Sequence, residues 1–174
     1  FRMSKNDYNT NANNSQNSKG LFIAGDITYT GLPEEYAIVD SAINDVQNST
    51  GKTLPPVYAT LGDSDDTDTD LANYIDFANS HNAPEVTADK LYYSKMIDGY
   101  KYIFLANPNG EKTMSSQQLE WLDSELADNK ENNDGKPVFI FMHDALTDTV
   151  ITQYAALTNT AEFGEVTKKY NNVF

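Results

Sequence analysis

Residues 21–26 have the sequence LFIAGD. The apolar run before Gly25 is too short for a helix and is typical of a short buried strand. Two later stretches repeat this pattern of an apolar run that ends in a residue with a metal-binding side chain. They are residues 57–63 (VYATLGD) and residues 138–143 (VFIFMH). We therefore expect three strands to carry the decisive part of the fold.

Helical patterns separate these strands. Pro33 suits the first turn of a helix, and Gly51 suits its end. The apolar residues between them recur at helical spacing and form one face: Tyr36, Val39, Ile43 and Val46. Three further helices are expected, each after a capping residue: Asp70, Ser115 (with Gln118 in a capping box) and Asn159 (with Glu162). Strands that alternate with helices predict an α/β fold.

One part of the sheet is expected to be antiparallel. Residues 91–97 and 100–106 favour strands, and the dipeptide Asp98-Gly99 between them is the strongest short signal for a tight hairpin. The strands of a hairpin run in opposite directions, so the sheet content should be mixed. Residues 173–174 are expected to begin another strand.

The sequence carries a formal net charge of -14. Such a surface repels nucleic-acid backbones and anionic membranes, so nucleic acid is not expected as a partner. Every apolar run is shorter than the roughly 20 residues of a membrane helix, which argues against membrane insertion. The absence of cysteine excludes disulfides and thiolate metal sites, and it is compatible with a secreted or cell-surface bacterial location. The acidic surface favours solubility or, alternatively, the attraction of divalent cations.

Asp26, Asp63 and His143 each follow a predicted strand. Ligands of open α/β sheets bind at the carboxyl ends of strands, so these side chains should meet in one crevice if the strands are neighbours. Carboxylate and imidazole donors suit Mn²⁺, Zn²⁺ or Fe. A glycine before each aspartate allows the sharp turn that would direct the carboxylate into the crevice. The alternative is that both aspartates are ordinary turn residues at strand ends.

Five stretches, in this order, are similar to motifs of the calcineurin-like metallophosphoesterases. They are LFIAGDITYTG, VYATLGDSD, LYYSKMIDGYKYIFL, SSQQLEWLDSEL and KPVFIFMHDAL. The resemblance covers most of residues 20–174 and implies two mixed β-sheets packed as a sandwich and flanked by helices, in four layers. It also implies a divalent metal centre, which in the family uses two metals to hold a phosphate group and activate water. Residues 1–19 are expected to be a remnant of the N-terminal strand followed by a flexible polar loop.

The sequence departs from the family pattern at three places. The first family motif, Asp-x-His, would fall at residues 5–7, which puts lysine at the aspartate position and Asp7 at the histidine position. Ser64 stands where the family has a phosphate-contacting histidine. The closing Gly-His-x-His motif would lie beyond Phe174, so the domain is expected to lack its C-terminal part. The resemblance therefore implies one metal ion or none, with Asp7, Asp26, Asp63 and His143 as ligands and Asp65 as the residue that orients the loop.

Two functions remain open at this point. We expect weak hydrolysis of a phosphate monoester or diester, with a phosphate-containing small molecule as partner. The alternative is a non-catalytic domain that keeps the fold as a structural or interaction module. An exposed sheet edge left by the missing parts would also allow self-association.

Three other features have less specific readings. Residues 63–70 (DSDDTDTD) could bind calcium, but their spacing does not fit an EF-hand loop and favours a solvated acidic loop. His81 is expected on the surface. The tyrosines at 29, 92, 93, 100 and 102 could form a ligand platform, and β-propensity favours ordinary half-buried strand residues.

Overall fold

The computed structural model describes residues 18–51, 54–65, 71–81, 85–149 and 156–174. Its strands form two main sheets. In the first sheet, β1 (Leu21–Ala24) pairs in parallel with β2 (Val57–Thr60). In the second, β4 (Tyr100–Phe104) lies between β3 (Tyr93–Ile97), which is antiparallel to it, and β5 (Val138–Phe141), which is parallel to it. The predicted mixed α/β class is confirmed.

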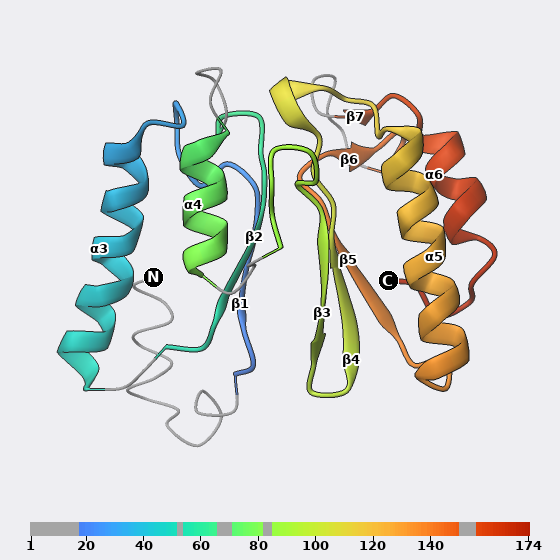
Figure 1. Cartoon of the computed structure of the whole chain (residues 1–174), viewed down its shortest axis with the longest axis horizontal. Coiled ribbons are helices and arrows are strands. Elements are labelled where there is room, and N and C mark those ends of the chain that lie inside the picture. The colour runs from blue at the N-terminus through green and yellow to red at the C-terminus, as the bar shows by residue number, and fades with distance from the viewer. Residues whose placement is uncertain (1–17, 52–53, 66–70, 82–84, 150–155) are drawn as a thin grey trace.

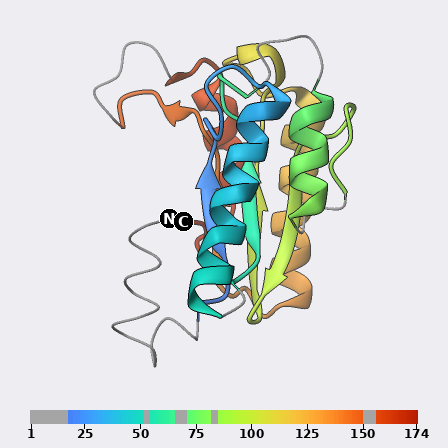
Figure 2. The same ribbon diagram turned by 90° about the vertical axis from the view of Figure 1, so that its left-hand side faces the viewer.

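Helices lie on both sides of the strands (Figure 1). On one side are α3 (Pro33–Thr50) and α4 (Ala72–Ser80), and on the other are α5 (Ser116–Asn132) and α6 (Thr160–Thr167). Figure 2, viewed from the side of α3, shows α3 and α4 lying next to each other along the strands. Three short elements were not predicted: η1 (Pro108–Gly110), β6 (Ala145–Leu146) and β7 (Ala156–Leu157).

Two predicted turns, at Gly51 and at Asp98-Gly99, are confirmed. Gly51 ends α3 in the left-handed conformation (φ 64°), and its N–H donates to the Gln47 carbonyl, as expected. The Asp98-Gly99 turn also has positive φ at both residues, 53° and 82°, which suits a tight hairpin. The cap predicted at Asp70 lies outside the described residues.

The predicted cap at Ser115 is confirmed in part, and the predicted side-chain cap at Asn159 is wrong. Ser115 caps α5 by accepting a hydrogen bond from the Gln118 N–H, but the Gln118 side chain bonds Ala106 instead of closing the capping box. Asn159 does not cap α6 with its side chain, because both of its side-chain polar atoms bond the Met114 backbone. In both cases a contact distant in sequence replaces the local one.

Aromatic rings join the two sheets. The Phe22 ring of β1 stacks on Tyr102 of β4 at 5.1 Å and on Phe141 of β5 at 4.9 Å, measured between ring centroids. Tyr58 of β2 stacks on Phe104 of β4 at 5.7 Å. These ring contacts pack β1 and β2 against β4 and β5. The packing brings the ends of β1, β2 and β5 together at the candidate site.

Two burial expectations are wrong. β1 was expected to be fully buried, but its first three residues are half-buried and Ala24 is exposed, since within the described residues β1 has a partner strand on one side only. His81 was expected on the surface, but its ring packs on Phe77 at 4.5 Å between centroids, and its Nε2 atom lies 2.6 Å from the Asp40 carboxylate.

The tyrosines at 29, 92, 93, 100 and 102 do not share one environment. Tyr92 and Tyr93 are buried, Tyr102 is half-buried in the ring cluster, and Tyr29 is exposed. This distribution fits structural side chains better than a ligand platform.

The last residues extend the second sheet. Val173 forms a parallel bridge with Val138, and the Ile140 N–H donates to the Phe174 carbonyl at 2.8 Å. The expected strand at residues 173–174 is therefore present as a short pairing with β5. Within the described ranges, no helix has the length and apolar character needed to cross a bilayer.

Lys101 is a buried charge under α5. Its ammonium group donates to the Glu125 carboxylate at 2.9 Å, to the Glu125 carbonyl at 3.1 Å and to the Asp128 carboxylate at 2.7 Å. Burial lowers the pKa of Lys101, but the two carboxylates outweigh it, and the pKa lies above its ordinary value. Lys101 therefore fastens α5 to β4 as a cation.

Replacing Lys101 with Ala should destabilise the fold by about 1–3 kcal/mol, because a part-buried carbonyl and two carboxylates lose their donor. Chemical denaturation measures this change. The loss should be full below pH 10.5, the ordinary pKa of lysine, and should fade as pH rises through the raised folded pKa. Lys95→Ala is the control, since Lys95 lies on β3 and its ammonium group is 3.8 Å from the Glu85 carboxylate, beyond hydrogen-bond distance. Equal effects of the two substitutions would contradict the assigned role.

Candidate metal centre

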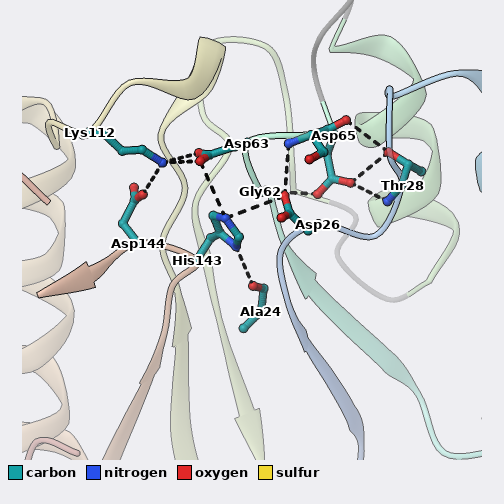
Figure 3. Close-up of polar contacts among 10 residues, drawn as sticks. Ala24, Asp26, Thr28, Gly62, Asp63, Asp65, Lys112, His143 and Asp144 are labelled. Atoms are coloured by element: carbon teal, nitrogen blue, oxygen red, sulfur yellow. Dashed lines mark hydrogen bonds and ion pairs between the residues drawn. The ribbon is translucent and has the colours of Figure 1, made fainter. Parts of the chain in front are cut away.

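Three strand ends meet at the same end of the molecule, the upper end in Figure 1. Asp26 follows β1, Asp63 follows β2 and His143 follows β5 (Figure 3). The His143 Nε2 atom lies 3.6 Å from an Asp26 oxygen and 3.9 Å from an Asp63 oxygen. The structure therefore brings together three of the four residues expected to bind a metal. The fourth, Asp7, lies outside the described residues.

Two glycines make this close approach feasible. Gly25 has φ 78° and Asp26 has φ 50°, so the chain turns sharply after β1 as expected. A Cβ atom at Gly25 would lie 2.6 Å from His143 Nδ1. At Gly62 the reason differs from the expected turn, since a Cβ atom there would lie only 2.0 Å from the Asp26 nitrogen. Gly62 is needed because the two strand ends touch.

Asp65 ties the loop after β1 to the loop after β2. Its buried carboxylate accepts hydrogen bonds from the Thr28 N–H at 2.8 Å, the Thr28 hydroxyl at 3.0 Å and the Gly62 N–H at 2.8 Å. Burial raises the pKa of Asp65, and these three donors offset part of that rise. Asp26 is held in turn, because its carboxylate accepts from the Ser64 N–H at 3.1 Å.

The His143 ring is oriented by a backbone contact. Its Nδ1 atom lies 3.0 Å from the Ala24 carbonyl oxygen. A carbonyl can only accept, so in a neutral ring Nδ1 would carry the hydrogen and Nε2 would keep its lone pair. That lone pair is on the nitrogen nearest Asp26 and Asp63. Metal-binding histidines commonly have this arrangement, with one ring nitrogen bonded to a carbonyl and the other facing the ion.

Lys112 and Asp144 complete the cluster, and sequence reasoning missed both. The Lys112 ammonium group binds both oxygens of Asp63 and also binds Asp144 at 2.8 Å. Burial lowers the pKa of Lys112, but the two carboxylates outweigh it and the pKa is raised. Asp144 could have been found because it follows His143 directly. Lys112 follows η1 and is 49 residues from Asp63, so no local pattern signals it.

The donor types are those that divalent metals prefer, but their spacing does not form a metal site. Two ligands about 2.0–2.2 Å from a shared ion lie about 3–3.5 Å apart. The distances from His143 Nε2 to the two aspartates, 3.6 and 3.9 Å, are slightly longer. Across the described residues, no group of three or more His, Cys, Asp or Glu side chains is placed so that it could hold a metal ion. Asp63 would also have to share its oxygens between the ion and Lys112.

The mouth of the cluster is open to solvent. The Asp26 side chain is 48% exposed, that of Asp63 39% and that of His143 20%. Water can therefore reach the atoms that face one another. The acidic stretch after Asp63 is only partly described, because residues 66–70 lie outside the described ranges.

Comparison with known proteins identifies the fold. No protein-family model and no curated protein matches the sequence. Among solved structures, a dimetal phosphatase from Danio rerio superposes with a TM-score of 0.60 at 14% sequence identity. The match covers 91% of this chain and 65% of the phosphatase, so the chain spans about two thirds of the length of that protein. The chain therefore shares its fold with a dimetal phosphatase.

Proposed function

We propose that this domain binds one divalent metal, Mn²⁺, Zn²⁺ or Fe, through Asp26, Asp63 and His143, and weakly hydrolyses a phosphate monoester or diester. The convergence of the His143 Nε2 atom with two carboxylates from separate strands is the observation that carries the proposal. The shared fold with a dimetal phosphatase supports it. We also propose that the two sheets form the four-layer sandwich of the metallophosphoesterases.

Each side chain would have a separate task. Asp26 and Asp63 would supply negative oxygen donors, and His143 would supply a neutral nitrogen whose direction is fixed by the Ala24 carbonyl. A bound divalent ion would supply a Lewis acid for the phosphate oxygens. The metallophosphoesterase family, which the sequence resembles, has a histidine at the position of Ser64. Serine offers no cationic donor there. Low activity follows from that difference.

A non-catalytic domain is the second candidate function. The observation that favours it is the Lys112 ammonium group, which already binds both oxygens of Asp63. If that ion pair excludes every divalent ion, the fold would serve as a structural or interaction module, which self-association through a sheet edge would suit.

Metal affinity separates the two functions. Asp26→Asn should weaken Mn²⁺ binding by more than about 100-fold, since loss of a direct ligand should exceed the effect of losing a supporting contact. Isothermal titration with Mn²⁺ measures this affinity, and turnover of an aryl phosphate monoester and diester measures activity. Asp45→Asn is the matched control, because it removes the same charge from an exposed position on α3.

Equal loss of affinity in the Asp26 and Asp45 variants would show that only the net charge attracts the ion. Wild-type protein that binds no Mn²⁺ and hydrolyses neither substrate would favour the non-catalytic function instead.

A further inference from the structure

The Lys112 ammonium group lies between two carboxylates from different strand ends. It binds both oxygens of Asp63 and one oxygen of Asp144. The Lys112 and Asp144 side chains are only 20% and 7% exposed, so this is a largely desolvated cation with two anionic partners. A divalent ion that bridged Asp63 and Asp144 would need to occupy the same space.

The lysine is fixed at both ends. Its backbone carbonyl accepts hydrogen bonds from the Thr158 N–H at 2.6 Å and the Thr158 hydroxyl at 2.9 Å. Its partner Asp144 accepts from the Asn107 amide at 2.9 Å, and Asn107 in turn accepts from the buried Gln118 amide at 3.2 Å. This chain of contacts keeps the ammonium group in place.

The charges of the cluster leave room for one divalent ion. Asp26, Asp63 and Asp144 supply three negative charges, and Lys112 cancels one of them. The remaining two match a single divalent cation. Asp65 lies beside this cluster, and three hydrogen-bond donors already surround its carboxylate.

We infer that Lys112 is a built-in cation that excludes a divalent ion from the space between Asp63 and Asp144. The inference extends the proposed function, from which it takes the first metal. It predicts that removing the ammonium group opens a cation site between Asp63 and Asp144. The ammonium group now lies between these carboxylates and repels a divalent ion there.

The test is the Mn²⁺ stoichiometry of wild type and Lys112→Met. Methionine has a similar length and no charge. Free Mn²⁺ is followed by electron paramagnetic resonance during titration, and thermal melting reports folding. Lys19→Met is the matched control, since it removes one positive charge just before β1, at the strand end opposite Asp26. We expect one ion in wild type, two in Lys112→Met and one in Lys19→Met.

The outcomes distinguish the inference from the proposed function. One ion in wild type and one of unchanged affinity in Lys112→Met would overturn the inference and leave the proposed function intact. No ion in wild type and one in Lys112→Met would support the inference and overturn the proposed metal site. No ion in either protein would overturn both.

A second variant covers the case in which Lys112→Met does not fold. The double variant Lys112→Met/Asp144→Asn removes the ammonium group and the more buried of its two carboxylate partners. It should bind Mn²⁺ at least about 10-fold more tightly than Asp144→Asn alone, because Asp63 no longer shares its oxygens with an ammonium group. Equal affinities of these two variants would overturn the inference.

Discussion

Gly62→Ala is expected to destabilise the folded protein by more than about 4 kcal/mol, the range that marks severe steric or packing damage. The added Cβ atom would lie 2.0 Å from the Asp26 nitrogen and 2.6 Å from an Asp26 carboxylate oxygen. The first of these atoms is backbone, so a rotamer change cannot relieve the clash. The loop after β1 would have to move away from β2, which would separate Asp26 from His143.

Chemical denaturation followed by circular dichroism measures this loss. Gly164→Ala is the matched control, because Gly164 lies within α6 and its added Cβ atom would meet nothing within 4 Å. Alanine should stabilise that helix by about 0.5–1 kcal/mol through its higher helix propensity. A Gly62→Ala protein as stable as wild type would contradict the close contact between the two strand ends.

Of the substitutions proposed, Asp65→Ala should have the second-largest effect, lowering the free energy of unfolding by about 3 kcal/mol. It removes the acceptor for two backbone N–H groups and one hydroxyl, all in buried hydrogen bonds. Buried donors without an acceptor cost about 1–3 kcal/mol each, and the costs at neighbouring groups do not simply add. Because Asp65 joins the loops that carry Asp26 and Asp63, metal affinity should fall as well.

Asp65→Asn serves as the comparison for this prediction. Its carbonyl oxygen can still accept from Thr28, while its amide group would face the Gly62 N–H as a second donor. Its stability should therefore lie between those of wild type and Asp65→Ala. If Asp65→Ala unfolds at the same denaturant concentration as wild type, the carboxylate does not hold the loops together.

Local sequence patterns predicted most of the fold, because apolar runs, turn dipeptides and capping residues mark most of its strands and helices. The apolar run before Gly25-Asp26, the Asp98-Gly99 hairpin and the Gly51 helix end all appear in the structure. Failures occurred where distant residues compete for the same polar group. Gln118 bonds Ala106 rather than its own helix start, and Asn159 bonds Met114. Such competition cannot be read from spacing alone.

Prediction of the candidate site likewise succeeded for residues that follow strands and failed for a residue in a loop. Asp26 and Asp63 were predictable because each follows an apolar strand and the carboxyl ends of neighbouring parallel strands meet. His143 follows β5 of the other sheet, and it joins them because the two sheets pack against each other. Lys112 was not predictable, because it lies in a loop and reaches Asp63 only through the tertiary fold. That lysine changes the chemistry most, since it brings a positive charge to the ligands of the proposed metal.

Anomalous diffraction from crystals grown with Zn²⁺ would test the proposed metal centre most directly. We predict one peak about 2.0–2.2 Å from the carboxylate oxygens of Asp26 and Asp63 and from His143 Nε2. The Lys112 ammonium group should remain bound to Asp144 in the same crystals. A crystal without a peak between Asp26 and His143, at a Zn²⁺ concentration that saturates other sites, would contradict the proposal.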